Sequence, residues 1–138
     1  MKALTLTQPW ATLVTLEEKI IETHSWGTSY RGPLAIHAAV GFPGWAKRQC
    51  FLEPFAGVLI KHGFSPDNLP LGRILCLTSL EDCIKTEGLL VTFREWAFDD
   101  FSPGRFAWFL GPIVKRFDPG IFARGKRGLW DWSQVSEA

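Results

Sequence analysis

The heptapeptide Leu34-Ala35-Ile36-His37-Ala38-Ala39-Val40 is the clearest β-strand in the chain. Leu34, Ile36 and Ala38 alternate with Ala35, His37 and Ala39, which gives the period of two that is typical of a strand. A turn rich in strand-breaking residues, Tyr30-Arg31-Gly32-Pro33, precedes it. This stretch makes a β-rich fold the starting expectation.

Other strands are expected on both sides of this segment, at residues 3–6, 19–25, 73–84, 104–110, 113–117 and 128–132. Helices are expected after Thr7, which is placed as the cap, from Pro43 to Gly63 with a break at Pro54, and over 89–98. Most strands are short and are separated by turns rather than by crossover helices. The pattern therefore predicts one α+β, β-rich domain over residues 1–138, built as a small, mostly antiparallel β-barrel with flanking and inserted helices.

The composition favours a folded, soluble protein. It is 46% hydrophobic and 21% charged, which is too apolar for a disordered chain. Seven Trp and eleven Phe are expected mostly in the core, although a flat ring also stacks on a nucleobase. The three cysteines lack metal-ligand spacing and are expected to be reduced, and no signal peptide or membrane span is visible. We therefore expect a cytoplasmic protein with no cofactor and no membrane association, while its oligomeric state stays open.

Charge is segregated although the net charge is only +1. Residues 81–100 contain six acids and two bases, whereas residues 115–127 contain five bases and one acid. The basic stretch is either a phosphate-binding surface or an ordinary solvated face. Near its end, Arg124, Lys126 and Arg127 are interleaved with glycines, so that both backbone and charge can approach a phosphate. The pattern Gly120…Gly125-Lys126 is close to a phosphate loop, but Arg127 stands where Ser or Thr is needed.

Polar residues are densest between Thr7 and His37. A buried Lys19 would act as a base, whereas an exposed one would only hold a phosphate. In an ideal strand Lys19 and Glu22 point to opposite faces, unless Lys19 lies in the loop before the strand. Glu22 and His24 share a face and are expected to interact. The candidate catalytic residues are therefore Lys19, Glu22 and His24, and no metal site is expected.

Five segments, taken in order, resemble the ASCH family of PUA-like proteins. They are Gln8-Pro9-Trp10-Ala11, then 18–26, then 30–38, then Gly104-Arg105-Phe106-Ala107-Trp108, and finally 125–132. The motif G-x-K-x-x-E-x-R of that family is matched by Lys19 and Glu22. Glu17 stands where the family has Gly, and His24 stands where it has Arg. The resemblance covers nearly the whole chain.

The resemblance implies a PUA-like barrel with a cleft beside the first helix, and a protein that interacts with RNA or with a modified nucleoside. Some ASCH proteins are similar to ribonucleases or to amidohydrolases acting on acylated cytidine; in the latter a Thr lies three residues after the Lys, where this chain has Glu22. Two functions are therefore carried forward, binding of RNA or other single-stranded nucleic acid, and metal-independent hydrolysis at the same cleft. The expected ligand-binding residues are Gln8, Trp10, Trp26, Tyr30, Arg31, His37, Arg105 and Lys126.

Overall fold

The computed structural model describes residues 1–134. Its strands are β1 (Lys2–Leu6), β2 (Ile21–His24), β3 (Gly32–Ala38), β4 (Arg73–Lys85), β5 (Phe106–Leu110), β6 (Lys115–Phe122) and β7 (Leu129–Asp131). Its helices are α1 (Trp10–Thr15), α2 (Gly44–Gln49), α3 (Phe55–Lys61) and α4 (Phe93–Phe98). The chain is thus α+β and strand-rich, as predicted.

One mixed sheet of seven strands organises the molecule, in the order β2-β5-β4-β3-β1-β7, with β6 paired to β4 outside this path. The β1–β3 pair is parallel, and the other pairs are antiparallel. The path is open, because β2 and β7 form its two ends. The expectation of a mostly antiparallel sheet is confirmed, but the sheet is not a closed barrel.

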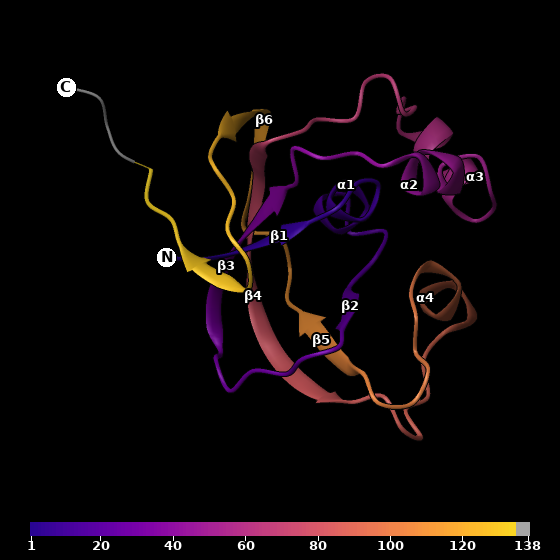
Figure 1. Ribbon diagram of the computed structural model, residues 1–138, viewed down its shortest axis with the longest axis vertical. Helices are drawn as coiled ribbons and strands as arrows, with labels where there is room; N and C mark the ends of the chain where they lie inside the picture. The colour runs from indigo at the N-terminus through magenta and orange to yellow at the C-terminus, as the bar shows by residue number, and fades with distance from the viewer. Residues whose placement is uncertain (135–138) are drawn as a thin grey trace.

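The long strand β4 pairs with two different strands along one of its edges. Its first half, Arg73–Leu77, pairs with β6, and its second half, Leu80–Lys85, pairs with β5. The register shifts between Ile74 and Cys76 on the β6 side and between Leu80 and Asp82 on the β5 side. Such irregularities bend a strand, and Figure 1 shows β4 curving through the length of the molecule.

Alternation along β3 places apolar residues on both faces of the sheet, as the sequence predicted. Leu34, Ile36 and Ala38 join the main core with Val14 of α1, whereas Ala35 packs with Trp130 in a smaller cluster on the other face. A third cluster, which includes Leu13, Phe55, Leu59 and Phe98, holds the helices together. In Figure 1, α2, α3 and α4 lie on one side of the picture, and β6, β7 and the N-terminus lie on the other.

Proline and glycine place the helix ends much as expected. Pro54 separates α2 from α3, and Gly63 follows the end of α3 with a φ of 80°. Two starts were predicted wrongly. Thr7 does not cap α1, because Gln8 accepts a hydrogen bond from the Thr12 amide instead. The expected helix over 89–98 begins only at Phe93, where Thr92 accepts a hydrogen bond from the Glu95 amide.

Glu17 adopts a left-handed backbone conformation with a φ of 58°. This region is disfavoured for residues other than glycine. An ion pair with Arg116, whose Nη2 lies 2.9 Å from Oε1 of Glu17, partly offsets the cost of this backbone conformation. Within residues 1–134, no helix has both the length and the apolar character needed to cross a membrane.

Candidate functional site

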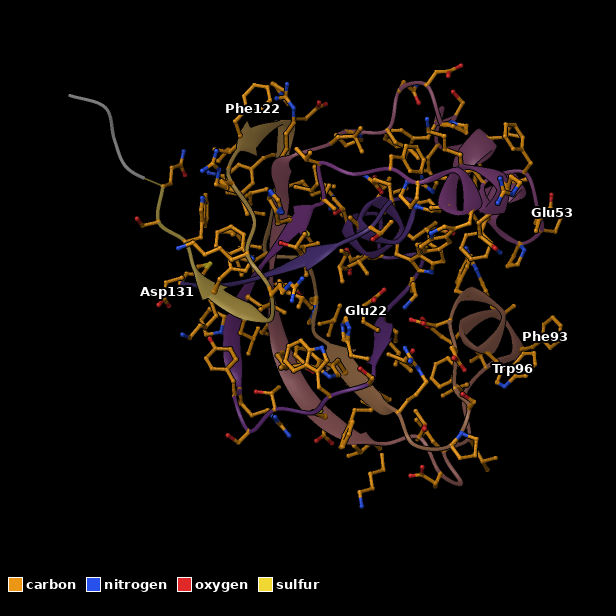
Figure 2. The ribbon with its side chains drawn as sticks, in the orientation of Figure 1. Glu22, Glu53, Phe93, Trp96, Phe122 and Asp131 are labelled. Carbon is orange, nitrogen blue, oxygen red and sulfur yellow. The ribbon has the colours of Figure 1, made fainter. Side chains whose placement is uncertain are left out.

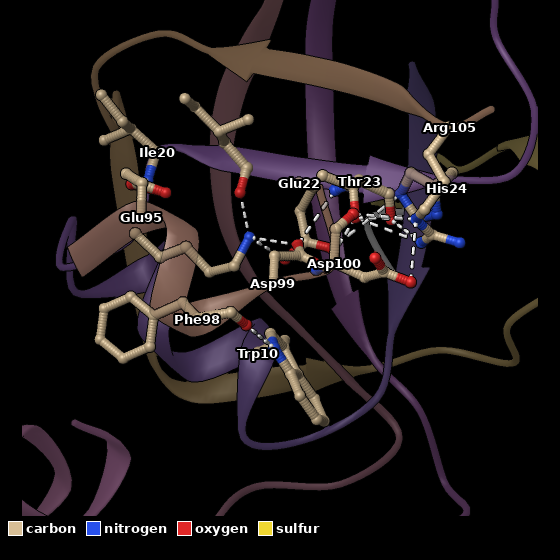
Figure 3. A network of polar contacts seen from close by, with 12 residues as sticks. Trp10, Ile20, Glu22, Thr23, His24, Glu95, Phe98, Asp99, Asp100 and Arg105 are labelled. Carbon is tan, nitrogen blue, oxygen red and sulfur yellow. Dashed lines mark hydrogen bonds and ion pairs between the residues drawn. The ribbon is translucent and has the colours of Figure 1, made fainter. Parts of the chain in front are cut away.

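Lys19 lies in the loop just before β2, so its amine turns toward the interior instead of following the strand's alternation. Its Nζ lies 2.8 Å from Oε1 of Glu22 and 2.7 Å from Oδ2 of Asp99. It also donates a hydrogen bond to the carbonyl oxygen of Ile21. The amine is fully buried. Lys19 and Glu22 are therefore close together, which the sequence allowed only if Lys19 lay in the loop before the strand, and Figure 3 shows Glu22 and Asp99 at the centre of this network.

The environment of Lys19 argues against its role as a base. Burial alone would lower the pKa of the amine, but the attraction of Glu22 and Asp99 is stronger in sum and raises that pKa above 10.5. An amine with a raised pKa stays protonated at neutral pH and cannot accept a proton. Lys19 instead compensates buried carboxylates, and it does not line either of the two cavities described below.

Glu22 and His24 have strongly altered acidities. Burial raises the pKa of Glu22 from 4.5 to about 7, against the opposing effect of Lys19. Burial lowers the pKa of His24 from 6.5 to about 4, so this imidazole is neutral at pH 7. Nε2 of His24 and Oε2 of Glu22 are 4.0 Å apart. The shared strand face predicted from the sequence is confirmed.

Asp99, directly after α4, is the residue of this network that sequence reasoning missed. Its carboxylate accepts hydrogen bonds from the amide and the hydroxyl of Thr23, at 3.0 and 2.7 Å. Arg105 donates to the Thr23 carbonyl at 3.1 Å and to the Asp100 carbonyl at 2.9 Å. Asp99 is far from Lys19 in the sequence, and no motif connects the two.

The larger of two adjoining cavities is a groove of about 1050 Å³ between the β2 end and residues 122–128, which we call the strap. Trp26 and His24 form part of one wall, and Arg124, Lys126 and Arg127 of the strap form part of the other. Figure 2 shows Phe122, the first strap residue, at the end of β6 and Glu22 well inside the molecule. The groove therefore combines aromatic rings with a cluster of positive charge.

His37 fixes the strap to the sheet. Its Nε2 lies 2.7 Å from the carbonyl oxygen of Ala123, and its Nδ1 lies 3.0 Å from Oγ1 of Thr5. Because the carbonyl oxygen of Ala123 can only accept a hydrogen bond, Nε2 of His37 carries the proton, and the Thr5 hydroxyl donates to Nδ1. A Cβ placed on Gly125 would lie 2.7 Å from Oγ1 of Thr5, so the strap backbone approaches the sheet closely.

The smaller cavity, of about 350 Å³, adjoins the groove through Thr5 and His24, which line both. We call it the acidic pocket. It is lined by Thr5, Leu6, Thr7, Trp10, Glu22, His24, Trp45 and Asp99. Trp10 is held in place because its Nε1 donates to the Phe98 carbonyl at 2.7 Å (Figure 3).

Of the expected ligand-binding residues, Trp10 lines the acidic pocket, and Trp26, His37 and Lys126 line the groove. The others lie elsewhere. Gln8 is buried and bonded to Thr12 and the Pro70 carbonyl, and the Tyr30 hydroxyl donates to the Pro33 carbonyl. Arg31 reaches Asp82 at 3.5 Å, and Arg105 supports Thr23 from outside the two cavities. These four residues shape or support the fold around the site.

Cys50, Cys76 and Cys83 are free thiols, as expected. Among residues 1–134, no three His, Cys, Asp or Glu side chains are grouped as a metal site would require. Comparison with models of protein families and with curated proteins found no match. The function must therefore be argued from the groove and the acidic pocket.

Proposed function

We propose that this protein is a PUA-like, ASCH-type domain that binds single-stranded RNA or a nucleotide in the groove between β2 and the strap. The observation that carries this proposal is the pairing of a half-exposed tryptophan with three clustered cations across one cavity. Phosphates would lie along the strap, and an unpaired base would stack on Trp26. The proposed site is therefore centred on the groove and not, as the sequence had suggested, on Lys19.

The strap is suited to binding phosphate because its positively charged side chains form no ion pairs with carboxylates of the described residues. Arg124, Lys126 and Arg127 are exposed, and none of them takes part in an ion pair within the described residues. Gly125 lies between Arg124 and Lys126, and Gly128 follows Arg127, which lets the backbone approach an anion without a side chain in the way. By contrast, Arg116 of the same basic stretch is engaged by Glu17.

Trp26 is a preorganised stacking surface. Its ring lies 4.6 Å from the buried Trp108 ring at 78°, and 5.5 Å from the His24 ring. Nε1 of Trp108 also donates to the Trp26 carbonyl at 3.2 Å. Since this side chain is already oriented, little rotamer entropy is lost when a base stacks on it.

Fluorescence anisotropy with a labelled single-stranded RNA of mixed sequence tests the proposal. Three phosphate contacts predict a log–log salt slope near about −2, from about −0.7 per contact. Lys126→Ala should reduce that slope by about 0.7. Trp26→Ala should weaken binding by about 1–3 kcal/mol at every salt concentration.

A matched control is Trp96→Ala, because Trp96 is 61% exposed on α4 and lines neither cavity. It should bind RNA like the wild type. Equal affinities for the wild type, Trp26→Ala and the triple variant Arg124→Ala/Lys126→Ala/Arg127→Ala at low salt would refute binding in the groove.

Hydrolysis of RNA or of an acylated cytidine is the second candidate, favoured by the acidity of Glu22. A carboxyl group whose pKa is about 7 can both give and take a proton at neutral pH. Incubation of the pure protein with each substrate in the presence of a chelator tests this function. Product that disappears with Glu22→Gln supports hydrolysis, whereas absence of product from the wild type rejects it for these two substrates.

A further inference from the structure

The acidic pocket differs in charge from the groove that it adjoins. Among its lining residues Glu22 and Asp99 are acidic, and none is a lysine or an arginine. His24 is neutral at pH 7 because burial lowers its pKa to about 4. A ligand that spans both cavities would therefore place its anionic part at the strap and a hydrogen-bond-donating part in the pocket.

Asp99 is already saturated. Its Oδ2 accepts from the amine of Lys19 and the amide of Thr23, at 2.7 and 3.0 Å. Its Oδ1 accepts from the hydroxyl of Thr23 and the amide of Asp100, at 2.7 and 2.8 Å. Each oxygen thus has two donors, so among the titratable side chains of the pocket the acceptors left for a ligand belong to Glu22 and His24.

Glu22 and His24 have unused hydrogen-bonding capacity. Glu22 is only 5% exposed; its Oε1 lies 2.8 Å from the amine of Lys19 and pairs with it, whereas Oε2 accepts no hydrogen bond from any of residues 1–134. Nε2 of His24 is also buried without a partner. Buried polar atoms of this kind are uncommon and call for an explanation.

The distance between these two groups suggests what would satisfy them. Nε2 of His24 and Oε2 of Glu22 are 4.0 Å apart, which is too far for a direct hydrogen bond. A nitrogen placed about 2.9 Å from both would bridge them. With the single proton of the neutral His24 ring on Nδ1, this nitrogen must carry two N–H groups, because the carboxylate of Glu22 and the bare Nε2 of His24 both accept.

The walls of the pocket favour a flat ligand. The rings of Trp10 and Trp45 come from α1 and α2, with centroids 5.8 Å apart and planes inclined at 44°. Trp10 is fixed by Phe55 at 5.6 Å and by its hydrogen bond to Phe98. Heteroaromatic rings stack on such surfaces.

We propose that the acidic pocket binds a nucleobase that carries an exocyclic amino group, of the cytosine or adenine type, through Glu22 and His24, and rejects the corresponding keto base. This inference rests on the proposed nucleotide-binding function and specifies the base that the site accepts. A keto oxygen in the same position would face the carboxylate of Glu22 and be repelled, because neither group can donate.

The test uses nucleotide pairs that exchange an amino group for a keto group. Binding of CMP and UMP, and of AMP and IMP, is measured by isothermal titration calorimetry at pH 8, where Glu22 is ionised. CMP and AMP should each bind at least ten-fold more tightly than the keto partner. A site that rejects a ligand by leaving buried polar groups unpaired is expected to discriminate at least this well.

The preference should also depend on pH. Lys19, Asp99 and Glu95 face Glu22 from the β2 loop and from α4, and His24 faces it from β2. Burial favours its protonation most, Lys19 opposes it, and the two acids add to the effect of burial, so that the pKa of Glu22 is raised to about 7. From pH 8 to pH 6 the amino preference should therefore fall about ten-fold. In Glu22→Gln, whose amide does not titrate, the amino-to-keto ratio should not vary with pH.

A matched pair of variants locates the base. Trp45 and Trp96 are 55% and 61% exposed, but only Trp45 lines the pocket. Trp45→Ala should weaken binding of CMP, and Trp96→Ala should not. If none of the four nucleotides binds, both the inference and nucleotide binding in the groove are refuted. If all four bind equally well, or the keto nucleotides bind more tightly, only the choice of base is refuted.

Discussion

Replacing Glu22 by Gln should remove one contribution to the pH dependence of the free energy of unfolding. The pKa of Glu22 rises from 4.5 to about 7 on folding, because burial penalises its charge. Between these values the folded state holds a proton that the unfolded state has released, so the contribution of Glu22 to stability falls as the pH rises through this window. The amide in Glu22→Gln does not titrate, and this loss is absent.

His24 has the opposite effect over nearly the same range. Burial lowers its pKa from 6.5 to about 4 on folding, so the unfolded state holds the extra proton. Its contribution to stability is fully present above pH 6.5 and is lost as the pH falls toward 4. Replacing His24 by Gln removes this acid-induced loss.

Each shift spans about 2.5 pH units, and one unit corresponds to 1.36 kcal/mol, so each group changes the free energy of unfolding by about 3 kcal/mol. In the wild type the two contributions largely cancel between pH 4.5 and 6.5. Relative to the wild type, Glu22→Gln should gain about 2 kcal/mol of stability between pH 4.5 and 6.5 as the pH rises, and His24→Gln should lose a similar amount.

Guanidinium unfolding followed by tryptophan fluorescence at pH 4.5, 5.5 and 6.5 measures these differences. Other acids with altered pKa values, such as Asp100 and Asp131, contribute equally to all three proteins and cancel in the comparison. The reasoning is wrong if both variants diverge from the wild type in the same direction, or if neither diverges.

Three further predictions concern other parts of the fold. Lys19→Met should lower the free energy of unfolding by about 3–5 kcal/mol, because Glu22 and Asp99 lose their buried counter-charge; chemical denaturation measures this, and adding Asp99→Asn should recover part of it. Glu17→Gly should raise stability by about 0.5 kcal/mol, because the relieved left-handed backbone outweighs the exposed Arg116 pair and the entropy of an added glycine; a melting temperature that falls with Gly, or rises with Glu17→Ala, would contradict this. Gly125→Ala should displace the strap from Thr5 and His37 and weaken RNA binding in the anisotropy assay, whereas Gly41→Ala, at a glycine that lines neither cavity and has no atom within 4 Å of the added Cβ, should not.

The local sequence pattern predicted most of the helices and strands, because hydrophobic periodicity, prolines and glycines determine the backbone over only a few residues. The strand at Leu34, the break at Pro54 and the shared face of Glu22 and His24 are of this kind. Closure into a barrel could not be predicted in this way, because it depends on which strands meet at the ends of the sheet, and here β2 and β7 leave the path open.

The site was harder to predict than the elements because its parts are brought together only by the tertiary fold. Asp99 joins Lys19 across the α4 packing, and Trp45 meets Trp10 through helix packing. Arg31 and Tyr30 were assigned to the ligand because they lie near Lys19 in the sequence, but the turn that contains them leads away from both cavities. The basic character of the strap was visible in the sequence, whereas its position opposite Trp26 was not.

The shortness of β7 has a consequence for how fast a ligand can leave. Only Leu129–Asp131 pair with β1, and behind them the strap is held by a few contacts centred on His37. Loss of these contacts would remove one wall of the groove and leave the ladders among β1, β3, β4 and β5 intact. Such a local opening needs much less free energy than global unfolding. We therefore expect residence times to be set by the undocking of the strap together with β7, with amide hydrogens there exchanging ahead of those in β3 and β4.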